Sequence, residues 1–199
     1  MNRLLLVVLV SGLVLGGTAG VGVAGPLDTP GYAKTVTCSA CHGYSGNSKV
    51  EAVPILAGMA PEYFKKAIED YATGKRLSPE MEPFAKQVKL LGVDEVAAFF
   101  AAQRREPALP RPDRAGVERG RVAATQCAAC HGTEGQGDSA KLVPRIAGQP
   151  AVYLRNQLVL FKADKRSPGD EAVTKMKAAL KGVPDETLAD LAAYYASLK

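Results

Sequence analysis

The fold of this 199-residue chain is decided by two short stretches, Cys38-Ser39-Ala40-Cys41-His42 and Cys127-Ala128-Ala129-Cys130-His131. Both follow the pattern Cys-x-x-Cys-His, and together they use all four cysteines and both histidines of the chain. The pattern is the attachment sequence for covalent haem. Two closely spaced thiols form thioethers with the vinyl groups along one porphyrin edge, and the next residue places an imidazole on the iron. The sequence therefore predicts two covalently bound haem c groups, held through Cys38, Cys41, Cys127 and Cys130, with His42 and His131 as axial iron ligands.

Three other uses of these residues compete with haem attachment. Two structural disulfides would suit an exported chain with four cysteines, but they would not need a histidine after each pair. A structural zinc site needs four ligands, and each motif supplies only three. A thioredoxin-like redox site needs a βαβ context, which the sequence does not show. The paired motif favours haem over all three.

An internal repeat locates the domains. Val53-Pro54-Ile55-Leu56-Ala57-Gly58 matches Val143-Pro144-Arg145-Ile146-Ala147-Gly148 at an offset of 90 residues. The same offset relates Tyr63 to Tyr153, Tyr71 to Phe161 and Arg76 to Arg166, and near the ends of the copies it becomes 95. Three prolines lie between the copies in residues 107–112, a composition typical of a stiff, extended connector. The repeat predicts a first domain over 25–106, a linker over 107–112 and a second domain over 113–199.

Both copies are predicted to be all-α. Apolar residues recur at helical spacing from Pro61 towards Gly74, and the second copy repeats this pattern from Pro150 to Phe161. A terminal helix is expected in each copy, over 94–103 and 185–198. No stretch alternates as a β-strand would.

Each iron needs a sixth ligand, and methionine is the soft candidate that remains. Besides Met1, the chain has only Met59, Met81 and Met176. Met81 and Met176 are equivalent at the offset of 95, whereas Met59 aligns with Gln149. The repeat therefore assigns Met81 to the first haem and Met176 to the second, each in a loop before the final helix. The alternative for a lone methionine is a core filler.

A proline follows each haem motif at a similar distance. Pro54 lies 12 residues after His42, and Pro144 lies 13 residues after His131. A proline carbonyl in such a loop can accept the second ring N–H of a ligating histidine and so fix its orientation. The alternative is an ordinary turn proline.

The first 24 residues have the pattern of a signal peptide: a short positive start at Arg3, an apolar run and a small-residue end at Ala24. The alternative is an uncleaved membrane anchor, which would leave the protein associated with the membrane. Either interpretation delivers the folded part across a membrane, and the first predicts a periplasmic protein.

Charge divides the chain unevenly. Residues 25–109 carry ten basic and ten acidic side chains, whereas residues 110–199 carry fourteen and ten. The sequence has no clustered stripe of Lys and Arg of the kind that nucleic-acid-binding proteins carry. The excess of basic side chains in the second half predicts a docking face for an acidic partner. The alternative is that these side chains only keep the surface solvated. The residues expected on this face are Lys162, Lys165, Arg166, Lys175, Lys177 and Lys181.

Beyond the first 24 residues, the chain resembles the dihaem class I cytochromes c, specifically the cytochrome c4 family. The resemblance rests on both Cys-x-x-Cys-His-Gly motifs, on the Pro-x-x-Ala-Gly stretches and the tyrosines that follow them, and on the paired methionines and terminal aromatic pairs. It implies two cytochrome c domains in tandem and a periplasmic electron carrier rather than an enzyme. A quinol-oxidising complex or a dehydrogenase would be the donor, and a terminal oxidase the acceptor.

Two other functions remain open at this point. A dihaem peroxidase or catalytic cytochrome would need a displaceable sixth ligand and polar distal groups, and no histidine is left over for that role. An electron-transfer subunit of a flavocytochrome-type dehydrogenase would share the same layout.

Overall fold

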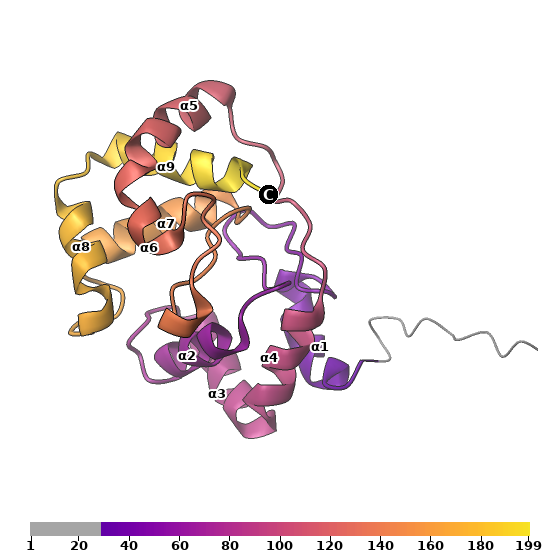
Figure 1. Cartoon of the computed structure of the whole chain (residues 1–199). Helices are drawn as coiled ribbons and strands as arrows, with labels where there is room; N and C mark the ends of the chain where they lie inside the picture. Colours follow the sequence, from indigo (N-terminus) through magenta and orange to yellow (C-terminus); the bar gives the residue numbers. More distant parts are fainter. Residues whose placement is uncertain (1–28) are drawn as a thin grey trace, which may run out of the picture.

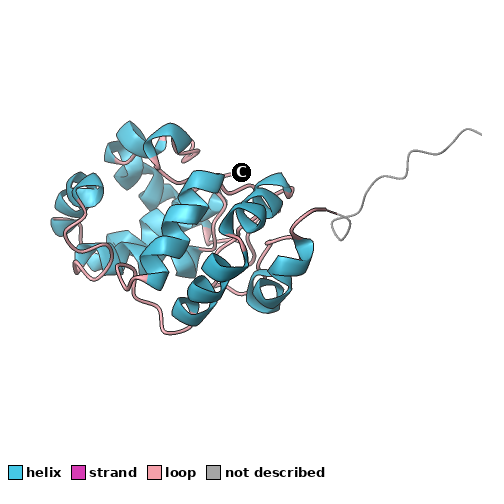
Figure 2. Ribbon diagram, turned by 90° about the horizontal axis from the view of Figure 1, so that it is seen from below, coloured by secondary structure: helices cyan, strands magenta, loops and turns pink. Residues whose placement is uncertain are grey.

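The computed structural model describes residues 29–199, so the predicted signal segment lies outside the described residues. All regular elements in this range are helices (Figures 1 and 2). No strand occurs between residues 29 and 199, where the two isolated β-bridges pair Arg76 with Arg166 and Asp138 with Val143. The prediction of an all-α fold is confirmed.

The described part of the first domain contains four helices. Their bounds are α1 (Tyr32–His42), α2 (Pro61–Ala72), α3 (Met81–Leu91) and α4 (Val93–Ala102). Proline is favourable at the first position of α2 because that residue needs no N–H partner. The predicted helices from Pro61 and around 94–103 are present, with ends that differ from the expected ones by one or two residues.

The second domain contains five helices. Their bounds are α5 (Arg114–Ala123), α6 (Ala128–His131), α7 (Ala151–Lys162), α8 (Thr174–Lys181) and α9 (Asp185–Ser197), with single 3-10 turns at 124–126, 139–141 and 171–173. Asp113 caps α5 by accepting the N–H of Gly116, a common way to satisfy a free donor at a helix start. In Figure 1 this domain, rose-red through orange to yellow, packs beside the first domain, which begins in indigo.

Each domain has its own apolar core. In the first, Phe99 and Phe100 are fully buried and meet edge to face, with ring centroids 5.2 Å apart. In the second, the buried residues include Leu188, Leu191 and Tyr195 of α9. Tyr194 and Tyr195 form a similar pair there, with ring centroids 5.1 Å apart. Aromatic pairs in this geometry add stabilisation beyond the area they bury, so each core contains one such contact.

The N- and C-terminal helices of the second domain cross closely at a glycine. A β-carbon added at Gly120 in α5 would collide with the carbonyl oxygen of Asp190 in α9. In the first domain Gly31 precedes α1, and a β-carbon there would lie 2.7 Å from the carbonyl oxygen of Glu95. Both domains therefore need a residue without a side chain at this crossing.

The segment between α4 and α5 contains no helix. One of its residues, Ala108, is buried in a small cluster with Ile55 and Ala57 of the first domain. Among residues 29–199, no helix is long and apolar enough to cross a bilayer.

Candidate functional site

The two Cys-x-x-Cys-His motifs lie at equivalent places in the two domains. The first forms the last turn of α1, and the second forms α6 together with Cys127 just before it. Positions three apart on a helix lie on the same face. Cys38 and Cys127 are partly buried, Cys41 and Cys130 are exposed, and none of the four thiols is in a disulfide. All four thiols are therefore free to form thioethers.

Each motif histidine meets the carbonyl of the proline that the sequence singled out. Nδ1 of His42 lies 2.9 Å from the carbonyl oxygen of Pro54, and Nδ1 of His131 lies 3.1 Å from that of Pro144. A carbonyl oxygen only accepts hydrogen bonds, so each Nδ1 carries the proton and each Nε2 presents a lone pair. Burial lowers the pKa of both histidines, against the opposing effect of these carbonyls. Both imidazoles are thus held in the neutral tautomer that can bind iron.

The methionines assigned by the repeat do not lie in loops. Met81 is the first residue of α3 and Met176 is the third residue of α8. The expectation of a loop was wrong because each segment has enough apolar residues at helical spacing to pack a helix, as Ala85 and Val88 do in α3. Both helices directly precede the terminal helix of their domain, and the assignment of the two methionines to the irons stays a prediction. Met59 is partly buried against the first core.

The interface between the domains is built from two arginines that cross it in opposite directions. Arg76 Nη2 donates to Tyr153 Oη at 2.8 Å, and Arg166 Nη2 donates to Tyr63 Oη at 2.9 Å. Both arginines also donate to Gln157 Oε1. Each guanidinium also stacks on an aromatic ring of its own domain. Arg76 Cζ lies 4.4 Å from the centroid of the Tyr71 ring, and Arg166 Cζ lies 4.3 Å from the centroid of the Phe161 ring. The equivalent residues of the repeat thus form a reciprocal contact.

These interface groups provide a test of whether the chain fits haem. Arg76 and Arg166 are only 4% and 8% exposed, yet the Nε of each has no hydrogen-bond partner in the described residues. A buried charge normally has an anionic partner, and haem carries two carboxylates. Burial alone would raise the pKa of Tyr63, but the positive charges of Arg166 and Arg76 outweigh this effect and lower that pKa. Free thiols, neutral imidazoles and two buried guanidiniums that have no acidic partner among the described side chains fit two haem groups. Between residues 29 and 199, no three His, Cys, Asp or Glu side chains gather to hold a bare metal ion.

Sequence reasoning missed the role of Gln149. Its Oε1 accepts the N–H of Ile55 at 2.8 Å, and its Nε2 donates to the carbonyl of Ile55 at 2.8 Å. The side chain is buried and ties the second domain to the backbone of the first. The mismatch between Met59 and Gln149 in the repeat was the available signal, because a polar residue at a buried position needs polar partners.

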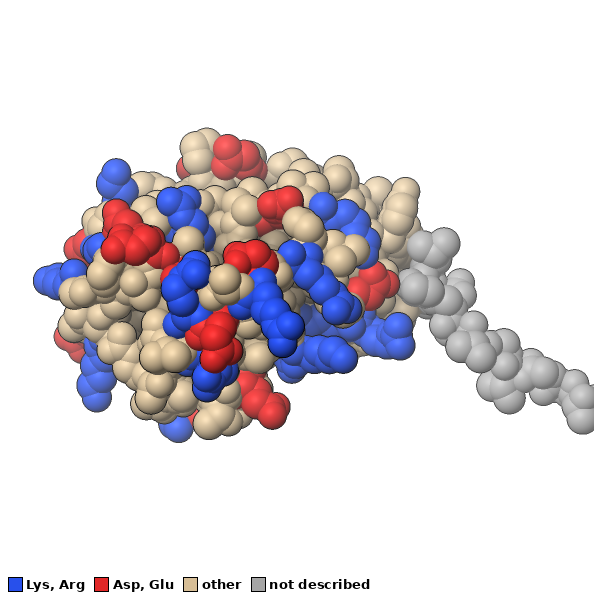
Figure 3. Space-filling view, turned by 90° about the horizontal axis from the view of Figure 1, so that it is seen from above, with Lys and Arg blue, Asp and Glu red and all other residues tan. Residues whose placement is uncertain are grey.

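The structure corrects the expected docking face at three residues. Lys162 Nζ donates to the carbonyl of Val183 at 2.7 Å and to Asp185 Oδ1 at 2.6 Å. Arg166 is buried at the interface, as described above. Lys177 Nζ lies 2.6 Å from Asp164 Oδ1 and also donates to the carbonyl of Ser167. All three side chains are held by contacts within the protein, so none of them is free for a partner. Lys165, Lys175 and Lys181 remain exposed, and no ion pair involves them in the described part of the chain. Figure 3 shows Lys and Arg side chains spread over the face seen from above, with Asp and Glu side chains between them.

Comparison with known proteins finds similarity over most of the chain. A family model described as Cytochrome c matches residues 117–199. Cytochrome c4 of Pseudomonas aeruginosa is 33% identical over 187 residues, covering 90% of this chain and 91% of that protein. The crystal structure of reduced recombinant cytochrome c4 from Pseudomonas stutzeri superposes with a TM-score of 0.76 at 26% identity, covering 85% of this chain and 97% of that one. A thiosulfate dehydrogenase electron acceptor of Stutzerimonas stutzeri is 30% identical over 182 residues, covering 82% of this chain and 79% of that protein.

Proposed function

The chain belongs to the cytochrome c4 family of dihaem electron-transfer proteins, and we propose that it passes single electrons between respiratory redox partners in the periplasm, towards a terminal oxidase. The observation that carries the proposal is the repeated geometry, a histidine oriented by a proline carbonyl in each domain, with the two domains joined through reciprocal arginines. Two redox centres in one chain allow an electron to enter at one domain and leave from the other.

The proposed site residues follow from the motifs and their equivalence. Cys38, Cys41, Cys127 and Cys130 attach the haems, His42 and Met81 ligate the first iron, and His131 and Met176 ligate the second. Each bound haem supplies a one-electron couple between ferric and ferrous iron. Pro54 and Pro144 hold the imidazoles in one orientation and strengthen them as donors, while the methionine thioethers favour the reduced state.

We also propose that the chain is exported and that it is divided into the two domains that the repeat predicts. Residues 1–24 would act as the signal peptide that delivers the chain to the periplasm. The limits 25–106 and 113–199, with a linker at 107–112, are supported by the helix-free segment that separates α4 from α5.

A kinetic experiment on the purified holoprotein tests the direction of transfer. We expect cell membranes that contain a terminal oxidase to oxidise the ferrous protein, and cyanide, which blocks such oxidases, to prevent this. Ferrous protein that stays reduced in the presence of active membranes would contradict the proposed acceptor.

The similarity to an electron acceptor of a dehydrogenase favours one second candidate. In this role the chain would receive electrons from a periplasmic dehydrogenase, either as a free partner or as a subunit of a flavocytochrome-type enzyme. Co-purification from the native host separates the two candidates. A stable complex with a dehydrogenase supports the second, and a free dihaem protein that membranes oxidise supports the first.

A further inference from the structure

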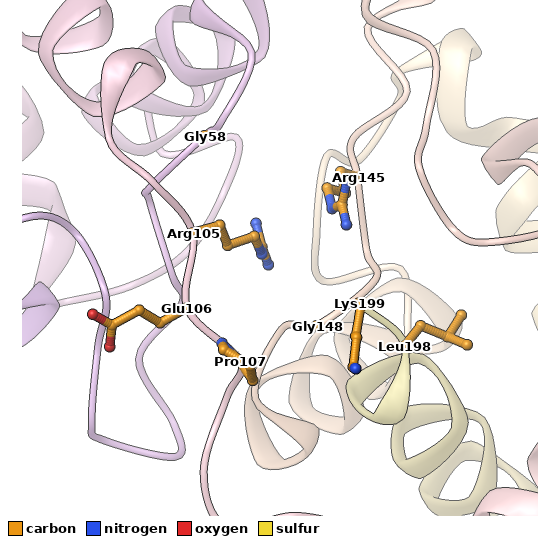
Figure 4. A pocket seen from close by; sticks show the side chains of 8 residues that line it. All are labelled: Gly58, Arg105, Glu106, Pro107, Arg145, Gly148, Leu198 and Lys199. Carbon is orange, nitrogen blue, oxygen red and sulfur yellow. The ribbon is translucent and has the colours of Figure 1, made fainter.

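A cavity of about 320 Å³ lies where the end of the first domain meets the end of the second. Figure 4 shows that Arg105, which follows α4, and Arg145, which follows Pro144, extend into it from opposite sides. Gly58 and Gly148, equivalent residues of the repeat, line it as well, and so does the C-terminal Lys199. The two domains therefore contribute one arginine each to a shared space.

Arg105 is not satisfied by the protein. Its Nε and Nη2 are buried and have no hydrogen-bond partner in the described residues. Burial and the positive charge of Arg145 lower the pKa of Arg105 to about 10, which leaves the side chain protonated near neutral pH. A buried cation with unpaired donors is unfavourable unless an acceptor, best an anion, completes it.

No acidic side chain of the described residues supplies this acceptor. Glu106 is the adjacent residue, but its Oε2 lies 2.7 Å from Lys49 Nζ, and Figure 4 shows its side chain directed away from the cavity. Residues 29–199 contain no ion pair to Arg105 or Arg145 within 4.0 Å. Arg145 is exposed and Arg105 is partly buried, so water screens part of the repulsion between the two guanidiniums, and an anion between them would remove the rest.

We propose that Arg105 and Arg145 form an oxyanion-binding site between the two domains. Guanidinium groups bind carboxylates and tetrahedral oxyanions through paired N–H donors, and the cavity is large enough for a small anion of either kind. The anion has two sources with the same chemistry, a free inorganic oxyanion such as phosphate or a carboxylate of a bound haem. The site goes beyond the proposed function because it does not depend on which partners exchange electrons with the chain.

The test uses the purified holoprotein and three variants, Arg105→Gln, Arg145→Gln and the control Arg104→Gln. Arg104 is the exposed neighbour of Arg105, so its replacement removes the same charge outside the cavity. Phosphate binding is measured by titration calorimetry at constant ionic strength, and the midpoint potential of each haem is measured by spectroelectrochemistry.

If the anion is free, the wild type binds one phosphate per chain. Arg105→Gln then weakens binding by about tenfold or more, as expected for loss of charge-assisted hydrogen bonds. Arg145→Gln also weakens phosphate binding, and Arg104→Gln leaves it unchanged.

If a haem carboxylate fills the site, phosphate does not bind. Arg105→Gln then lowers the midpoint potential of one haem more than Arg104→Gln does, because a positive charge near the haem favours the reduced state. A wild type that binds no phosphate, together with equal potentials in the Arg105 and Arg104 variants, would overturn the proposal.

Discussion

The two domains attach the same kind of group through helices of different construction. In the first domain α1 is one continuous helix that ends at His42, whereas in the second α5 ends at Ala123 and a 3-10 turn leads into the short α6. The first core is built around Phe64, Phe99 and Phe100, and the second around the leucines and tyrosines of α9. The shared proline contact of His42 and His131 shows that the histidine is held alike while the surrounding packing differs.

The contrast extends to the surface next to the predicted methionine ligands. In the first domain Glu80 and Glu82 flank Met81, and the equivalent residues of the second domain are Lys175 and Lys177, which flank Met176. Glu82 and Lys177 are each paired within their own domain, with Lys86 and Asp164, so the opposite charge that a partner meets is that of Glu80 and Lys175. A partner that approaches this surface meets different fields at the two domains.

The largest expected effect is the loss of one domain. Replacing Cys127 and Cys130 by serine removes the second haem from a core that small domains can hardly stabilise alone. We expect the helical signal in circular dichroism to fall by about half, in line with the similar helix content of the two domains, while the first domain keeps its haem absorbance. Full native helix content in this variant would show that the second domain folds without haem.

The next effect is the loss of one methionine ligand. Replacing Met81 or Met176 by leucine is expected to remove about half of the weak long-wavelength band of methionine-ligated ferric haem, because each change affects one iron of two. Replacing Met59 by leucine, the matched control in the first domain, is expected to leave the band at full strength. A large loss in the Met59 variant would mean that Met59, not Met81, ligates the first iron.

A smaller effect is expected where α5 crosses α9. Gly120→Ala places a β-carbon against the carbonyl of Asp190, so the helices must separate. The variant is expected to lower the free energy of unfolding by about 1–3 kcal/mol, as overpacking does, despite the better helix propensity of alanine. Denaturant unfolding of the holoprotein measures this. Gly182→Ala is the control, since nothing lies within 4 Å of its added β-carbon, and equal stability of both variants would argue against a tight crossing.

The smallest effect concerns charge. Reversing the exposed Lys175 and Lys181 to glutamate is expected to slow electron transfer with an acidic redox partner by about two- to tenfold at low ionic strength and to flatten its salt dependence. In the first domain Lys86 is equivalent to Lys181 and is already paired with Glu82. Reversal of Lys86 together with Lys89, which pairs with Glu69, is the control and is expected to change the rate less. Equal changes in the rate of electron transfer after reversal of either pair would contradict a docking role for the second domain alone.

The amino-acid sequence alone determined what depends on near neighbours along the chain. The spacing of Cys38, Cys41 and His42 predicts haem attachment because those atoms must reach one porphyrin, and the helical periodicity after Pro61 follows from burying one face. The repeat also indicated Pro54 and Pro144, whose carbonyls do meet the histidines. The assignment of Met81 and Met176 to the irons stays a prediction.

Only the tertiary structure decided which residues meet across the interface. Arg76 and Tyr153 are 77 positions apart, and Gln149 and Ile55 are 94 apart. No periodicity or local motif encodes such pairs, since they depend on how two separately folded cores pack together. Lys177 and Arg166 looked like surface charges for the same reason. Their partners become adjacent only when the chain is folded, and the unpaired Arg105 facing Arg145 is likewise a property of the packed domains.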